Sequence, residues 1–284
     1  MRYLSIGHIC EDVTPTGKVL GGSVAFSALT ARALGWDSAI VTKAKAELDL
    51  TSLSNIDVCR LCDKRTTTFE NRYTPERGRT QILHETAGTL NAADIPKEWL
   101  GADIVHLAPI AREIDPKIIS AFTRTFIGIT PQGWMRQWDS RGIVSKCPLG
   151  ETEEVLRRAN ATVLSIEDVE GDWNIIERWS KIVPVLAVTQ GAKGATVFAN
   201  GKSKQVAAEP AAEIDPTGAG DVFATTFFIN LQRTGDPMQA AVVANRIAAF
   251  AVTRKGILGI PTDEEVRQIM GRQYDNSRRS EARN

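Results

Sequence analysis

The chain has 284 residues, of which 43% are hydrophobic, 24% charged and 6% aromatic, and its 34 Lys and Arg residues balance its 34 Asp and Glu residues. A chain of this length can form one large α/β domain or two small ones with a substantial hydrophobic core. The ordinary apolar fraction and the zero net charge exclude a disordered chain and argue against a dedicated nucleic-acid or membrane-surface binder.

The N-terminus and the cysteines predict a cytoplasmic protein. The apolar run that begins at Tyr3 is short and strand-like, so we expect no signal peptide. The longest apolar stretch, residues 242–252, is interrupted by polar residues and is too short to span a bilayer. Cys59 and Cys62 have the spacing of a redox or zinc pair, but no second pair follows them. We therefore expect reduced structural cysteines and no disulfide framework.

The N-terminal segment has the pattern of a β-loop-α-β unit. Tyr3–Ile9 is apolar and alternating, which predicts a strand. Ser23–Leu34 carries apolar residues at helical spacing and is followed by Gly35, a common residue just beyond a helix end. Ser38–Thr42 is the next predicted strand. This order is typical of a parallel sheet with helices on its faces.

Residues 62–90 have a different pattern. Thr66–Tyr73 and Thr80–His84 are rich in strand-forming residues, and the turn signal Pro75–Gly78 lies between them. The segment therefore predicts a hairpin, and its many polar residues suit a lid at the edge of the fold. We assign 62–90 to a β lid, with 12–20 as a second candidate segment of it.

From Ala102 onward the α/β alternation resumes, with no repeat and no linker. We therefore expect residues 1–271 to form a single α/β domain and 272–284, a polar stretch, to form a flexible tail. The predicted strands here are Ile104–Leu107, Phe126–Ile129, Ala161–Ser165 and Val185–Thr189, and the predicted helices are Ile118–Thr125, Glu151–Arg158, Trp173–Lys181, Val222–Leu231 and Met238–Thr253.

One short segment indicates a specific chemistry. Asp215–Phe223 reads D-P-T-G-A-G-D-V-F and leads into an apolar helix. The amides of the small residues at the helix start are not used by the helix, and together with the helix dipole they can bind a phosphate. Asp221, in the first turn, can accept a proton from a hydroxyl beside this anion hole. This equipment suits phosphoryl transfer to an alcohol. The predicted amide donors are Gly218, Ala219 and Gly220.

The segment Asp215–Phe223 resembles the C-terminal signature of the ribokinase/PfkB family of carbohydrate and nucleoside kinases. Three further segments match the family in family order. Gly21–Gly35 resembles its N-terminal glycine signature, Val188–Gly194 its nucleotide-site segment, and Asn245–Gly256 the helix and loop that close over adenine. The resemblance implies a ribokinase-like fold: a mainly parallel central sheet, helices on both faces and a small β lid.

The resemblance also implies a donor site for ATP and Mg²⁺. Asp221 would be the catalytic base, and the amides of 218–220 would hold the migrating phosphoryl group. An acidic motif that organises Mg²⁺ would fall near Ser165, with Glu167 and Asp168 as candidates, and its register stays open. Asp215 would fall where relatives bind a monovalent cation such as K⁺. Thr189, Gly191 and Gly194 would line the ATP phosphates and ribose, and Asn245 and Gly256 would lie near the adenine.

For the acceptor, the resemblance implies that Asp12 accepts hydrogen bonds from substrate hydroxyls, near Gly22 of the double glycine. Phe26 stands where the common sugar-kinase pattern has Asn, which indicates an altered substrate pose. Thr130–Gly133 stands where many relatives have D-P-N, and Arg136 follows as in those relatives. Three polar residues of the hairpin could also reach a polyol: Asn71, Arg79 and Gln81.

These departures resemble the branch that includes plant-type myo-inositol kinases. We therefore expect an ATP-dependent kinase for a small carbohydrate or cyclitol, without nucleic-acid or membrane partners, acting as a monomer or a homodimer. A ribose, adenosine or cytidine kinase of the same fold is the first alternative. A catalytically silent polyol- or nucleotide-binding regulator is the second, although Asp221 is present. No P-loop and no G-x-G-x-x-G after the first strand occur, which disfavours other nucleotide-binding folds.

Overall fold

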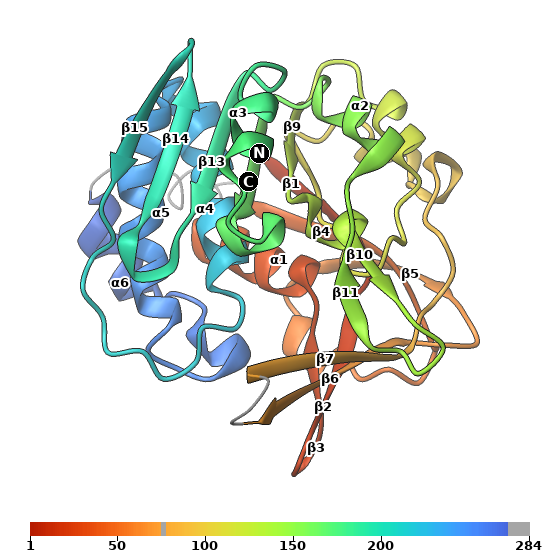
Figure 1. Ribbon diagram of the computed structural model, residues 1–284. Coiled ribbons are helices and arrows are strands. Elements are labelled where there is room, and N and C mark those ends of the chain that lie inside the picture. The colour runs from red at the N-terminus through yellow and green to blue at the C-terminus, as the bar shows by residue number, and fades with distance from the viewer. Residues whose placement is uncertain (75–77, 272–284) are drawn as a thin grey trace.

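A computed structural model describes residues 1–74 and 78–271, and a large sheet runs through its centre (Figure 1). The seven strands from β13 to β5 are mutually parallel, and β14 and β15 add an antiparallel edge. In spatial order the sheet contains β15 (Lys202–Val206), β14 (Ala195–Ala199), β13 (Val185–Thr189), β12 (Ala161–Ser165), β9 (Phe126–Ile129), β8 (Ile104–Leu107), β1 (Arg2–Ile6), β4 (Asp37–Ala44) and β5 (Asp57–Cys62).

Helices cover both faces of this sheet because its central strands are apolar on both sides. In β13, Leu186 and Val188 join one core cluster and Ala187 joins the other. The first cluster includes residues of α2 (Glu153–Leu156) and α3 (Trp173–Trp179), and the second includes residues of α1 (Ser23–Ala33), α4 (Ala219–Thr234), α5 (Pro237–Ala251) and α6 (Asp263–Met270). This arrangement confirms the predicted ribokinase-like architecture.

The predicted elements agree well with the parallel sheet. Strands β8, β9, β12 and β13 have the predicted bounds, and α1, α4 and α5 lie where helices were expected. The predicted helix Ile118–Thr125 is wrong. Pro116–Ala121 forms a 3-10 helix, because the Asp115 side chain caps the Lys117 amide at 2.9 Å and β-branched isoleucines follow. The predicted helix Glu151–Arg158 reduces to Gly150–Thr152, a 3-10 turn, and the single turn of α2.

Two segments far apart in the sequence form one small sheet, which we call the lid sheet. It contains, in spatial order, β3 (Gly17–Gly21), β2 (Cys10–Thr14), β6 (Thr67–Thr74) and β7 (Gly78–Glu85), and it projects from one end of the large sheet (Figure 1). The β2–β6 pair is parallel and the two outer pairs are antiparallel. The lid sheet thus unites parts of the segments 12–20 and 62–90, while Cys62 ends β5 of the large sheet.

A short hairpin covers the outer edge of the lid sheet. It contains β10 (Arg136–Trp138) and β11 (Val144–Lys146). The Leu83 amide of β7 donates to the Gly142 carbonyl of the hairpin turn at 2.8 Å. This hairpin was not predicted, since its strands are only three residues long.

Among the described helices, none has the length and apolar character needed to cross a bilayer. All four cysteines are free, with Cys59 and Cys62 on the edge strand β5. The tail 272–284 lies outside the described residues.

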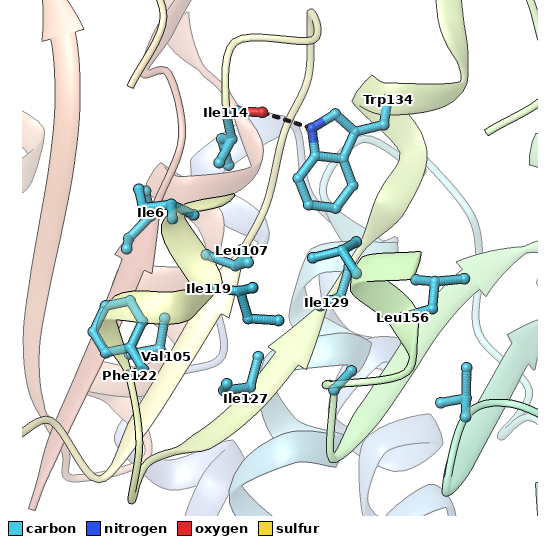
Figure 2. Packing of buried hydrophobic residues seen from close by; sticks show 14 of the residues in the cluster. Ile6, Val105, Leu107, Ile114, Ile119, Phe122, Ile127, Ile129, Trp134 and Leu156 are labelled. Carbon is cyan, nitrogen blue, oxygen red and sulfur yellow. Dashed lines mark hydrogen bonds between the residues drawn. The ribbon is translucent and has the colours of Figure 1, made fainter. Parts of the chain in front are cut away.

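One indole anchors the core on the α2–α3 face of the sheet. Trp134, which is 3% exposed, donates its Nε1–H to the Ile114 carbonyl at 2.9 Å (Figure 2). Its ring packs with the isoleucines and leucines of β8, β9 and the surrounding turns. The indole therefore ties the loop after β9 to the loop after β8, and both loops lead to the site described below.

Replacing Trp134→Phe should lower the free energy of unfolding by about 1–3 kcal/mol, because it removes packed atoms and leaves the buried Ile114 carbonyl without its donor. Urea denaturation measures the change. The matched control is Trp173→Phe on the surface, which should change stability by less than about 0.5 kcal/mol. Equal effects of the two substitutions would contradict the anchoring role.

Candidate active site

The start of α4 forms an anion hole beside an acidic side chain. Gly218 caps the helix with φ 81°, in the left-handed region that favours glycine. Of the residues that the structure describes, none accepts a hydrogen bond from the amides of Gly220 or Asp221, and the space around Gly220 is open. The Ala219 amide instead donates to the Pro216 carbonyl at 3.1 Å. In the described part of the chain, the amides of Gly218, Gly220 and Asp221 are therefore free donors at the start of the helix.

Phe26 packs against Gly218, the glycine at the start of α4. Its ring, which is 4% exposed, packs so closely against Gly218 that a Cβ at that position would overlap it. Gly22, at the start of α1 with φ 98°, lies against the His8 carbonyl and also has no room for a side chain. Phe26 therefore sets α1 against the start of α4, and Gly22 allows α1 to begin against the loop between β1 and β2.

The Asp221 side chain keeps some exposure, yet the atoms packed around it raise its pKa to about 6. A hydrogen bond from the Ser23 hydroxyl and the positive charge of Arg136 act in the opposite direction, and the negative charge of Asp168 adds to the rise. Groups from α1, β10 and the loop after β12 therefore all act on this carboxyl. A carboxyl that titrates close to neutral pH suits a general base.

Arg136 connects the lid sheet to this acidic centre. Its Nη1 donates to the Ile110 carbonyl at 2.9 Å, and its guanidinium lies 5.6 Å from the centroid of the Phe69 ring in β6. Its positive charge acts to lower the pKa values of Asp221 and Asp168, against the larger effect of burial, which raises both. Arg136 therefore lies between the lid and the predicted base.

The two acidic candidates after β12, Asp168 and Glu167, have different surroundings. Asp168 accepts hydrogen bonds from the Ser165 amide at 2.9 Å and from Gln132 Nε2 at 3.4 Å, and burial raises its pKa. Glu167 points to solvent. In the described part of the chain, no group of three or more acidic, His or Cys side chains gathers in a way that could hold a metal ion. Asp168 is thus the acid of this motif that acts electrostatically on Asp221.

On the predicted donor side, two residues converge on one backbone segment, 206–208. Asn245, which is 7% exposed, donates to the carbonyls of Val206 and Ala207, each at 3.0 Å. Gly194, with φ 88°, lies directly against the same segment. The predicted phosphate loop, with Thr189 at the end of β13 and Gly191 beside open space, lies next to it. The side-chain amide of Asn245 therefore fixes the backbone at 206–207, which lies next to the predicted donor region.

Asp215 joins the anion-hole loop to the loop that follows α5. Its carboxylate accepts from the amides of Thr217 and Gly256, each at 3.0 Å. Burial acts to raise its pKa, but these hydrogen bonds outweigh that effect and lower the pKa. Two residues predicted from separate motifs, Asp215 and Gly256, are thus in direct contact.

The lid sheet presents polar groups on the face that carries Phe69. Asn71 and Gln81 are cross-strand partners, and Gln81 Nε2 donates to Asn71 Oδ1 at 3.2 Å. Asp12 is in register with Phe69, so its side chain lies on the same face, against Gly21. The Arg79 side chain lies outside the described residues. Asp12, Asn71 and Gln81 are therefore placed together by strands that are far apart in the sequence.

Two residues close to the site, Ser23 and Glu113, were not predicted from the sequence. Ser23 directly follows the double glycine, so its position at a helix start was available as a signal. Glu113 lies in a loop without periodicity, and nothing in its neighbourhood indicated that it would be buried.

The parallel sheet, the β lid and the anion hole beside Asp221 define a ribokinase-like protein. The family model described as "pfkB family carbohydrate kinase" matches residues 157–263 of this chain. The chain is 25% identical to an inositol 3-kinase of Zea mays, over 92% of this chain and 74% of that one, and 27% identical to a cytidine kinase of Thermococcus kodakarensis, over 88% and 95%.

Among solved structures, a pyrophosphate-dependent kinase of the ribokinase family, complexed with a pyrophosphate analogue and myo-inositol, superposes with a TM-score of 0.78. Its sequence is 22% identical, and the match covers 94% of this chain and 99% of that one. The fold is thus that of the ribokinase-like kinases, and the sequence is similar to the ribokinase/PfkB family of carbohydrate kinases.

The electrostatic coupling at the site predicts two opposite shifts. Asp168→Asn should lower the pKa of Asp221, because it removes a neighbouring negative charge, and Arg136→Gln should raise it, because it removes a positive one. Carboxyl-detected NMR of aspartate-labelled protein measures both. A pKa of Asp221 that stays unchanged in both variants would contradict the coupling.

Proposed function

We propose that this chain transfers the terminal phosphoryl group of a donor to a hydroxyl of a small, uncharged polyol. The observation that carries the proposal is the position of Asp221, whose pKa is about 6, in the first turn of α4 beside the free amides of Gly220 and Asp221. The carboxylate takes the hydroxyl proton as the oxygen attacks phosphorus, while the amides stabilise charge on the transferring group. The lid sheet closes over the acceptor and excludes water.

We propose ATP as the donor, bound along Thr189–Gly194 and under the loop at Gly256. Two exposed apolar side chains support a nucleotide: Ile214 is 63% exposed and Leu258 is 71% exposed. The contact between Asp215 and Gly256 joins the two loops that carry these side chains. Such a surface suits a planar base. Pyrophosphate, the donor named for the solved neighbour, is the alternative and would leave this apolar surface unused.

The residues present fit Mg²⁺ held mainly by the donor phosphates, with few protein ligands. Asp168 is the acid placed to reach it, through water, and the ion would neutralise phosphate charge during transfer. Asp215 would be a ligand for K⁺ only if it shared its carboxylate with the amides that it already binds. A cytoplasmic location, where ATP is abundant and thiols stay reduced, fits this activity.

The acceptor side supports a neutral polyol. The carboxylate of Asp12 and the side-chain amides of Asn71 and Gln81 can bind several hydroxyls. Phe26 is buried and has no polar group with which to bind a hydroxyl. Among the described side chains, the carboxylates of Asp12, Asp168 and Asp221 and the guanidinium of Arg136 contribute charge here, and this excess of negative charge disfavours anionic acceptors. The names of the relatives favour a cyclitol such as myo-inositol. A nucleoside is the second candidate, because the cytidine kinase is matched over nearly its whole length.

A panel of acceptors tests the proposal. The purified chain is mixed with ATP or pyrophosphate and Mg²⁺, with and without K⁺. The neutral acceptors are myo-inositol, ribose, fructose, cytidine and adenosine, and the anionic controls are fructose 6-phosphate and gluconate. Release of ADP or phosphate and the mass of the product are measured. We expect one neutral polyol to be phosphorylated and fructose 6-phosphate and gluconate to be inactive. Phosphorylation of no acceptor with either donor would refute the proposed function.

Asp221→Asn should lower kcat by about 10²–10⁴-fold, because the hydroxyl loses its proton acceptor. Donor binding, measured by calorimetry, should persist, since the amides of the anion hole remain. The melting temperature at pH 7 should not fall, because a carboxyl with a raised native pKa destabilises the fold once it is ionised. A variant that keeps most of its kcat would contradict the role of Asp221.

The rate should also depend on pH in one direction. Because Asp221 must be ionised to accept the proton and its pKa is about 6, kcat/KM for the acceptor should be level above pH 7. Below pH 6 it should fall by about tenfold per pH unit. Steady-state rates between pH 5 and pH 8 measure the profile. A profile that stays level down to pH 5 would contradict the assignment.

A further inference from the structure

One buried acid near the site has no part in the proposed reaction. Glu113 lies in the loop after β8 and is 2% exposed. Its Oε1 accepts from the amides of His8 and Ile110, each at 3.0 Å, and its Oε2 accepts from the amides of Ile110 and Ala111 at 3.0 and 2.7 Å. The carboxylate therefore gathers three backbone amides from two separate loops.

These amides belong to loops that carry the acceptor side. His8 lies between β1 and β2, and Asp12 follows it on β2. The carbonyl of Ile110 accepts the hydrogen bond from Arg136 Nη1 at 2.9 Å. Glu113 thus holds, through one carboxylate, the start of the strand that presents Asp12 and the loop that holds Arg136.

The neighbourhood of Cys10 confirms that these groups lie close together. Cys10 is only 3% exposed, and this burial raises the pKa of its thiol. The charges of Asp12, Glu113, Arg136 and Asp221 all act on this thiol. Cys10 also packs in one buried cluster with Ile110 and Ala111, whose amides Glu113 holds, so Glu113 lies beside the lid strand β2.

An acid is required at this position for a physical reason. Three amides point inward, and a buried amide without an acceptor destabilises the fold. A carboxylate, with four lone-pair directions, can accept from all three. The loop also holds Arg112 at φ 58°, a strained conformation for a residue other than glycine, which the surrounding hydrogen bonds must maintain.

We propose that Glu113 is a positioning residue for the acceptor: it sets the distance between Asp12 on the lid strand and Arg136 without touching the substrate. The inference rests on the proposed function. Glu113 forms no contact with the donor loops at Gly191–Gly194 or at Asp215, because its partners are His8, Ile110 and Ala111. Its loss should therefore affect the acceptor and leave the donor unaffected.

Glu113→Gln tests the inference at constant volume, because the amide nitrogen cannot accept a hydrogen bond. The KM for the acceptor should rise by about 10-fold to 100-fold, since small displacements of binding groups are costly, while the donor KM stays within about twofold. Glu113→Asp keeps the charge but shortens the side chain, so its acceptor KM should lie between those of the wild type and Glu113→Gln. The matched control, Glu98→Gln, alters an exposed acid and should leave both KM values unchanged.

A second readout does not depend on activity. Alkylation of Cys10 by N-ethylmaleimide, followed by peptide mass spectrometry, reports whether the start of β2 has moved. Cys10 should stay protected in the wild type and in Glu98→Gln and should react faster in Glu113→Gln. If Glu113→Gln does not fold, the same two measurements on Glu113→Asp replace it.

An unchanged acceptor KM together with unchanged protection of Cys10 would overturn the positioning role. A parallel rise of donor and acceptor KM would also overturn it, because it indicates a general structural defect. A wild-type chain that phosphorylates no acceptor refutes the proposed function, and the Cys10 labelling then still decides whether Glu113 holds the start of β2.

Discussion

The close packing of the Phe26 ring against Gly218 is the contact on which the site depends. It requires glycine at position 218, whose left-handed backbone turns the chain into α4 with the first amides free. The same contact sets α1 against α4, so that the Ser23 hydroxyl reaches Asp221. An apolar ring thereby determines where the anion hole, the acid and its hydrogen-bond donor lie relative to each other, although the ring itself has no polar group to offer a substrate.

A second set of contacts joins the lid sheet to this centre. Arg136 stacks on Phe69 of the lid and donates to the Ile110 carbonyl, and Glu113 holds the Ile110 amide and the start of β2. The hairpin that begins at Arg136 also bonds to the lid edge through Gly142. The lid is therefore linked to the large sheet by buried polar contacts as well as by its chain connections, and its motion would be transmitted to Arg136. This linkage gives the acceptor side a defined geometry, while the donor side depends on a separate set of bonds around Asp215 and Asn245.

The parts of the fold that could be predicted are those with local signals. Strands such as Phe126–Ile129 and Val185–Thr189 are short apolar runs between turn residues, and the helix after Gly218 begins at a glycine motif. The predicted helix at Ile118–Thr125 was wrong because a proline and an aspartate cap formed a 3-10 turn instead. The edge strands β15 and β5 were missed because their polar residues hide the pattern and only pairing with a neighbour defines them. The strand β14, which lies between β13 and β15, was also missed although it is mostly apolar.

The sequence by itself determined the parallel sheet and the glycine-led helix start at Asp215–Phe223, because helix starts and glycine turns act over a few residues. Only the tertiary structure decided that Phe26 lies under the anion hole, that the Asn245 amide holds backbone, and that Asp215 meets Gly256. It alone revealed Glu113 among three amides from two loops. The physical reason is that burial and the pKa of a carboxyl depend on every group packed around it, and these groups come from strands and loops far apart in the chain.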